Sequence, residues 1–319
     1  MRSFAQVQEC KLEVMEELGR VDSAEASARF EVTGKQVVPG LSLGVGRKGP
    51  KAFELVVVTR GVTDPLLLDR TIRLASGEAR VVKLGAPPRP RITSAWSKKP
   101  KKVGEIGQQV GPDDAAWVGT GSLYGRMAGT GLYAQLTNRH VVGLLSRAGR
   151  RMHQGRKPLG AFAVGSLNVP NSHGNLTDAA SIALDDGYEF YPRWDHGLKG
   201  NLRKVRPPNE DDLGSPFSNT GQTVGTRYGA PTAGDLDDFP VGYDEGLVYY
   251  DNVWMLDNGF GKAFSAPGHS GAACVSLQDA AAVLHLYAGG PADGIDRTFA
   301  LDMVASMMAA GMVPELLEV

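Results

Sequence analysis

FSAPGHSGAACV, residues 264–275, places a serine between two glycines, with a proline before the turn and a short apolar run after it. Gly268 and Gly271 allow a tight turn that most residues could not follow. Such a turn can point the backbone amides of Gly268 and Ser270 into one small pocket, with the Ser270 hydroxyl at its edge. Nucleophilic acyl transfer needs this arrangement of a hydroxyl and two donors for the developing oxyanion.

Two upstream segments supply the partners that such a serine requires. LTNRHVV, residues 136–142, places His140 directly after a predicted strand, and TDAASIAL, residues 177–184, places Asp178 at the start of an alternating strand. A histidine can act as general base and then as general acid, while a carboxylate fixes its tautomer. The order His140, Asp178, Ser270, with gaps of 38 and 92 residues, therefore indicates a catalytic triad.

These segments resemble the three signature segments of trypsin-like serine proteases. The resemblance covers about residues 105–319, includes VLHLYAG at 283–289, and is nearest to an intracellular, bacterial- and plant-type subgroup with a small N-terminal domain. It implies a mainly β fold, a chymotrypsin-like double antiparallel β-barrel preceded by a small α+β domain. The first barrel would hold His140 and Asp178 and the second Ser270, with the cleft between them.

The resemblance also implies the roles of further residues. The amides of Gly268 and Ser270 would form the oxyanion hole, and Asp185 or Asp186 is the alternative to Asp178 as the acid. Catalysis of this kind needs no cofactor. No metal site is expected, since the histidines lack metal-ligand spacing and two cysteines cannot make a four-cysteine site.

Substrate-binding residues follow from the same resemblance. The strand at Tyr287, Ala288 and Gly289 would pair with extended substrate backbone by β-strand addition. Phe264, six residues before the serine, would lie at the base of the main pocket. An aromatic side chain there argues against a pocket for Arg or Lys, so we expect a small or apolar preference.

The chain departs from the family pattern on both sides of the serine. His269 stands where many relatives have Asp or Asn, and Ala272 and Ala273 stand where Gly, Pro or Ser is more usual. In digestive-type relatives that Asp pairs with a newly freed N-terminus. No activation-site sequence of that sort precedes the barrel, so we expect no activation by N-terminal cleavage. A pocket blocked by His269, and hence an inactive enzyme, is the alternative.

Composition shifts divide the chain into three parts. Residues 1–84 form a small α+β domain, residues 85–104 a Pro- and Lys-rich linker, and residues 105–319 the peptidase domain. Outside the barrels the residue patterns predict these elements: a helix over 3–20, strands over 41–46 and 53–59, a hairpin of 71–74 with 79–84, and a Met- and Ala-rich helix over 297–311.

Charge is distributed unevenly over the 319 residues. Residues 1–104 carry 19 basic and 11 acidic side chains, whereas the remainder carries 15 and 24. We expect the two halves to dock against each other or the charge to be solvated; a basic half that meets an anionic partner is the alternative. The acidic runs at 210–212 and 235–238 lie in polar loops and are predicted to be solvated.

The sequence predicts a cytoplasmic serine endopeptidase acting on polypeptides. No segment resembles a signal peptide or a membrane span, and Cys10 and Cys274 are predicted to be free, reduced thiols. The alternatives are a catalytically silent protease-like scaffold in a larger assembly, an esterase, and self-processing within residues 85–104. A protein partner for the N-terminal domain is suggested by position alone. Nucleic acid is not expected, because the Lys cluster lacks interleaved aromatics. The substrate and oligomeric state are left open.

Overall fold

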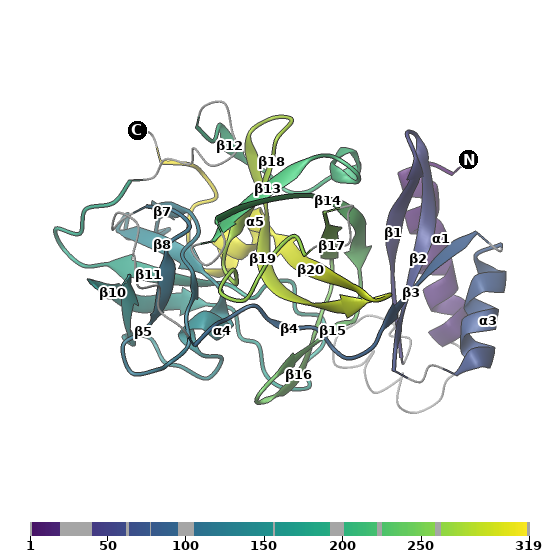
Figure 1. The fold of residues 1–319 in the computed structure, drawn as a ribbon, viewed down its shortest axis with the longest axis horizontal. Helices are drawn as coiled ribbons and strands as arrows, with labels where there is room; N and C mark the ends of the chain where they lie inside the picture. The colour runs from purple at the N-terminus through teal and green to yellow at the C-terminus, as the bar shows by residue number, and fades with distance from the viewer. Residues whose placement is uncertain are drawn as a thin grey trace.

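Strands dominate the structure, a computed structural model, and lie in two large curled sheets (Figure 1). The fold is a chymotrypsin-like double antiparallel β-barrel preceded by a small α+β unit, which confirms the predicted fold class. The structure describes these residues: 2–19, 40–61, 64–76, 78–94, 105–155, 157–191, 201–221, 225–258 and 263–317. Within them, no helix is both long and apolar enough to cross a membrane.

The first barrel is a seven-stranded sheet in the order β6-β5-β9-β10-β11-β8-β7. Alternate residues of its strands point inwards, and Val110, Met152, Leu159 and Ile182 form a buried apolar cluster there. Its elements are β5 (Gln109–Pro112), β6 (Gly119–Thr120), β7 (Tyr124–Arg126), β8 (Tyr133–Thr137), the short helix α4 (Arg139–Val142), β9 (Arg151–Gln154), β10 (Lys157–Gly165) and β11 (Ala180–Leu184).

The second barrel is a ring of antiparallel pairings, β13-β14-β17-β20-β19-β18 and back to β13. A separate hairpin, β15 with β16, lies at the bottom centre of the view in Figure 1, beside β4 (Arg89–Pro90). The elements are β12 (Lys204–Val205), β13 (Phe217–Gly221), β14 (Gly225–Leu236), β15 (Phe239–Tyr243), β16 (Gly246–Tyr250), β17 (Val253–Asp257), β18 (Ala273–Ser276), β19 (Ala281–Ala292), β20 (Ile295–Asp302) and α5 (Met303–Ala309).

The prediction of a helix over 297–311 is wrong for residues 297–302, which belong to β20, and α5 starts at Met303. Residues 298–300 pair with β17, and Asp302 ends the strand by accepting hydrogen bonds from the amides of Val304 and Ala305. The helix α5 therefore starts only after this cap.

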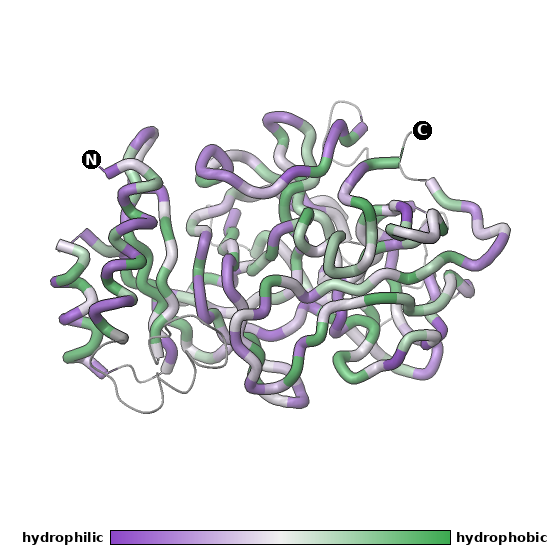
Figure 2. The backbone as a smooth tube through the Cα atoms, turned by 180° about the vertical axis from the view of Figure 1, so that it is seen from behind, coloured by the Kyte–Doolittle hydropathy of each residue, from purple (hydrophilic) through white to green (hydrophobic). Residues whose placement is uncertain are grey.

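The N-terminal unit packs two helices on one face of a small sheet. Its elements are α1 (Phe4–Gly19), β1 (Leu41–Gly49), β2 (Ala52–Arg60), α3 (Pro65–Leu74) and β3 (Ala79–Leu84). The predicted helix over 3–20 and the first two strands are confirmed. Figure 2 shows hydrophilic and hydrophobic residues alternating along these helices, as in helices that pack by one face.

The hairpin predicted over residues 71–84 is wrong. Residues 65–74 form the helix α3, and β3 lies parallel to β2, so the unit is a strand–helix–strand crossover. The start signal lies in the sequence: the Asp64 side chain accepts a hydrogen bond from the amide of Leu66, and Pro65 occupies the first turn.

Opposite charges hold the N-terminal unit against the second barrel. Lys11, 2% exposed, lies 3.0 Å from Asp235 and 2.8 Å from Asp237, and Arg60 lies 3.1 Å from Asp238. The expected docking of the two halves is confirmed, and the prediction that the acidic loop at 235–238 is solvated is wrong. In the acidic run at 210–212 the prediction is wrong only for Asp212, which is buried against Arg206, whereas Glu210 and Asp211 are exposed. Removing a carboxylate from water favours such pairing with a cation.

The sheet of the N-terminal unit also continues into the second barrel. Strand β1 pairs with β14 at Val45 and Gly234, and β3 meets β19 at Leu84 and Ala292. The division of the chain at residues 84 and 104 stays a prediction, and residues 95–104 of the predicted linker lie outside the described residues. Cys10 and Cys274 are both buried and form no disulfide, as predicted.

Candidate active site

His140 and Asp178 come from the ends of two paired strands. Strand β8 pairs with β11, with Thr137 opposite Ala180. The chain leaves β8 through an extended Asn138 and turns into the single-turn helix α4, which carries His140. Asp178 lies just before β11, so the pairing of these strands brings the two side chains together.

The carboxylate of Asp178 is completely buried and hydrogen-bonded to His140. Its Oδ2 lies 2.5 Å from His140 Nδ1, and its Oδ1 accepts the backbone amide of His140 at 3.1 Å. Burial alone would raise the pKa of Asp178, but the charge and hydrogen bonds of His140 outweigh it and the pKa is lowered. Asp178 is therefore ionised at neutral pH and keeps the proton of His140 on Nδ1.

Tyr243 supports this pair from the β15–β16 hairpin. Its hydroxyl donates to Asp178 Oδ2 at 2.8 Å and lies 2.7 Å from the hydroxyl of Tyr250, which in turn accepts from Asn168 at 3.0 Å. Burial, and then the charge of Asp178, raises the pKa of Tyr243 well above its ordinary value, so this tyrosine is a neutral donor. Sequence reasoning missed these residues, because an alternating VGYDEGLVYY stretch predicts only strands.

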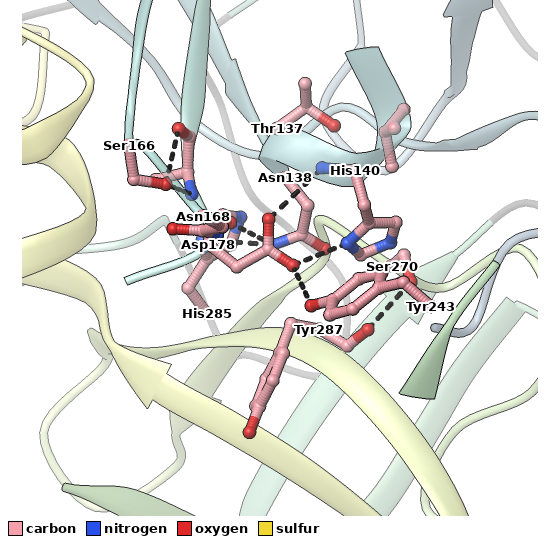
Figure 3. Close-up of polar contacts among 12 residues, drawn as sticks. Thr137, Asn138, His140, Ser166, Asn168, Asp178, Tyr243, Ser270, His285 and Tyr287 are labelled. Carbon is pink, nitrogen blue, oxygen red and sulfur yellow. Dashed lines mark hydrogen bonds and ion pairs between the residues drawn. The ribbon is translucent and has the colours of Figure 1, made fainter. Parts of the chain in front are cut away.

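Ser270 lies in a turn that only glycines allow. Gly268 and Gly271 have φ angles of 95° and 96°, and a Cβ atom at Gly271 would lie 2.1 Å from the carbonyl oxygen of Thr120. The Ser270 hydroxyl donates to the carbonyl of Tyr287 at 3.0 Å. Figure 3 shows Ser270 beside the imidazole of His140, on the side away from Asp178.

The second nitrogen of His140 is unused. Among the described residues, His140 Nε2 is buried without a hydrogen-bond partner. Such a group is costly to leave unpaired, which makes it a strong acceptor for any nearby hydroxyl. His140 Nε2 is thus able to accept a proton, while the Ser270 hydroxyl donates to the Tyr287 carbonyl instead.

The two amides beside Ser270 converge on one oxygen atom. Gly268 N and Ser270 N both donate to the carbonyl oxygen of Arg91, the latter at 3.1 Å. This is the convergence predicted for an oxyanion hole. Sequence reasoning missed Arg91, because it lies in a Pro-rich stretch with no signal for a position in the site.

His269 does not line the cavity beside His140. Its ring is buried against β13, with Nδ1 2.7 Å from Asn219 Oδ1, and a Cβ atom at Gly221 would lie 2.5 Å from its Cδ2. Burial, followed by the charges of Arg227 and Arg91, lowers the pKa of His269 to about 4. The imidazole is therefore neutral at physiological pH.

The remaining predicted residues fall in different places. Tyr287, Ala288 and Gly289 lie on β19, and the latter two already pair with β4 (Arg89–Pro90). Phe264 is fully buried in the apolar core, and its role at the base of a pocket stays a prediction. The alternative acid Asp185 pairs with Arg151 at the surface, and Asp186 is exposed.

Comparisons with known proteins give matches in structure only. No family model matches the chain, and no curated protein matches it. Three similar solved structures are a glutamic acid specific serine protease that uses a histidine triad in substrate binding (16% identity, 67% of this chain and 100% of that one, TM-score 0.48), Thermobifida fusca Protease A (16%, 66% and 98%, 0.46) and Nocardiopsis protease (17%, 66% and 97%, 0.47).

Proposed function

We propose that this chain is a serine endopeptidase in which Ser270 is the nucleophile, His140 the general base and acid, and Asp178 the residue that orients the imidazole. One observation carries the proposal. A buried Asp178–His140 pair, whose Nε2 has no hydrogen-bond partner among the described residues, lies beside a serine whose turn points two amides at one carbonyl oxygen. These are the parts that acyl transfer by a serine hydroxyl requires.

The chemistry follows from these positions. His140 Nε2 takes the proton of the Ser270 hydroxyl while Oγ attacks the substrate carbonyl carbon. The amides of Gly268 and Ser270 stabilise the oxyanion; the loss of one such donor costs about 10²–10³-fold in turnover. His140 then gives its proton to the leaving amine, and water hydrolyses the ester by the same steps. The substrate is a polypeptide, held along Tyr287, Ala288 and Gly289.

A rotation of one side chain precedes attack. The Ser270 hydroxyl must leave the Tyr287 carbonyl and turn towards His140 Nε2. Rotation about one Cα–Cβ bond between staggered positions is fast compared with enzyme turnover. The hydrogen bond to Tyr287 is therefore compatible with an active enzyme once the cleft is open.

A catalytically silent scaffold is the second candidate. The observation in its favour is that the Ser270 hydroxyl and both neighbouring amides are bound to carbonyl groups of the chain itself. The cytoplasmic location, the intracellular subgroup and a protein partner for the N-terminal unit stay predictions.

Fluorophosphonate labelling separates the two candidates. Wild type, Ser270→Ala, His140→Ala and Arg91→Glu are treated with the reagent. Arg91→Glu places a negative charge next to Asp296 in place of the ion pair and so weakens the binding of residue 91 at the site. The modified residue is located by peptide mass. We expect labelling at Ser270 that both active-site substitutions abolish; a folded Arg91→Glu variant that never labels would contradict the proposal.

A further inference from the structure

The segment Arg89–Thr93 lies across the candidate site in extended form. On one side, β4 is antiparallel to β19, with Arg89 opposite Gly289 and Pro90 opposite Ala288. On the other side, Thr93 and Val118 exchange two backbone hydrogen bonds of 2.9 and 2.7 Å. The chain is thus fixed by main-chain contacts both before and after residues 91 and 92, which is how a protein binds an added strand of peptide.

Between these contacts, the Arg91 carbonyl lies where the reaction would take place. Its oxygen accepts the amides of Gly268 and Ser270, the two donors assigned above to the oxyanion. Because both donors bind one carbonyl oxygen, the carbonyl carbon of Arg91 is held close to Ser270. The peptide bond presented for attack is Arg91–Ile92, and such positioning supplies much of the rate of an intramolecular reaction.

The Arg91 side chain lies in a narrow site whose acidic residue, Asp296, complements its positive charge. Its guanidinium forms an ion pair with Asp296 and donates to the Arg297 carbonyl at 3.4 Å, and only 12% of the side chain is exposed. Gly289 forms one wall, because a Cβ atom there would lie 2.0 Å from Arg91 Nε. Asp296 therefore faces the residue before the presented bond.

The other side of the bond faces the base. Ile92 and Pro90 line a cavity of about 330 Å³ together with His140, Trp117 and Leu144. The nitrogen of Ile92 would be the leaving amine, and His140 is the group that must protonate it. Both halves of the presented bond thus lie next to the groups that would act on them.

From this geometry we propose that the chain cuts its own Arg91–Ile92 bond, and that its pocket accepts arginine; the proposal rests on the proposed function. Ser270 Oγ bonds to the Arg91 carbonyl carbon and His140 takes the hydroxyl proton. The C–N bond to Ile92 breaks, and His140 returns the proton to the Ile92 nitrogen as it leaves. Water then cleaves the ester, which releases Arg91 as a carboxylate and restores the Ser270 hydroxyl.

The two products, residues 1–91 and 92–319, stay associated. Strands β1 and β3 pair with β14 and β19, and Lys11 remains bound between two aspartates of the larger piece. Cleavage separates residues 89–91 from Ile92 and allows the Arg91 carbonyl to leave the amides of Gly268 and Ser270. The proposal thus replaces the expectation from the sequence that no cleavage before the barrel activates the site. In digestive-type relatives an Asp before the serine pairs with the freed N-terminus. Here that position is His269, which is buried and neutral, so the new amino group of Ile92 has no such partner there.

Intact mass under denaturing conditions tests the proposal. The full chain is incubated as wild type, Ser270→Ala, Arg91→Glu and, as the matched control, Arg73→Gln, whose side chain is exposed on α3, outside the bound segment. We expect wild type and Arg73→Gln to split into residues 1–91 and 92–319 at a rate independent of protein concentration. Ser270→Ala should stay intact, and Arg91→Glu should be cut at least tenfold more slowly.

Labelling of Ser270 in the Arg91→Glu variant distinguishes failure of the self-cleavage proposal from failure of the protease proposal. Elution volume and thermal melting first establish that this variant is folded. If that variant labels but wild type stays uncut, the segment is an inhibitor: self-cleavage is wrong while the protease proposal stands. If the folded variant neither labels nor is cut and wild type stays intact, the protease proposal itself fails. Cutting at another bond, or only at high protein concentration, also overturns the inference.

Discussion

His140 and Ser270 come from different barrels, beside β8 and β18 respectively, and their surroundings differ. On the first barrel, the Asp178 carboxylate is bound by His140 and by Tyr243, so the acid–base pair is fully assembled. On the second barrel, the Ser270 hydroxyl is bound to Tyr287, and its turn holds the carbonyl of Arg91. Under the proposed function, access to the site is therefore controlled beside Ser270, where the segment Arg89–Thr93 is the occupant.

The largest expected effect comes from disrupting the hydrogen-bonded pair of Asp178 and His140. Asp178→Asn keeps the shape but removes the charge that fixes the His140 tautomer, and turnover should fall on the order of 10⁴-fold. Rates of self-cleavage and of peptide hydrolysis measure this. The matched control is Asp185→Asn, since Asp185 pairs with Arg151 at the surface. Equal losses in both variants would mean that Asp178 has no special role.

Tyr243→Phe should have a smaller effect on the same side. The Tyr243 hydroxyl is one of the groups that lower the pKa of Asp178, so its loss raises that pKa and moves the acid limb of the pH–rate profile upwards. We expect kcat to fall about tenfold, the size of one hydrogen bond to a charged group, with little change in KM. Tyr228→Phe, at an exposed position, is the control. An unshifted profile would reduce Tyr243 to a packing residue.

On the second barrel, exchanging the charges of Arg91 and Asp296 tests whether their ion pair holds the segment over Ser270. Arg91→Glu and Asp296→Arg should each release the segment and speed fluorophosphonate labelling of Ser270 about tenfold, because each places like charges together at a partly exposed pair. The double variant should restore slow labelling by restoring opposite charges. Simple addition of the two single effects would show that this ion pair does not hold the segment.

The sequence predicts the parts of this site that local chain geometry determines. Gly268 and Gly271 were indicated because their positive φ angles exclude most residues, and His140 and Asp178 because each adjoins a strand with a clear pattern. Tyr243 and Arg91 were missed because their contacts with Asp178 and Ser270 join distant parts of the chain and leave no periodic pattern.

Errors in secondary structure have a similar origin. The signals for α3, Asp64 and Pro65, lay just before the segment that was interpreted as a strand. The acidic loop at 235–238 was predicted to be solvated because its partners, Lys11 and Arg60, lie on elements far away in sequence. Charge composition predicted that the two halves would attract each other, but not which side chains would meet.

The most direct test of the central claim is labelling of Ser270 by a fluorophosphonate in Arg91→Glu, with and without His140→Ala. The account predicts one modified residue, Ser270, in the first protein, and loss of that modification in the second, because Nε2 of His140 must take the serine proton. Labelling of Ser270 that is indifferent to His140, or a folded Arg91→Glu protein that does not react, would contradict it.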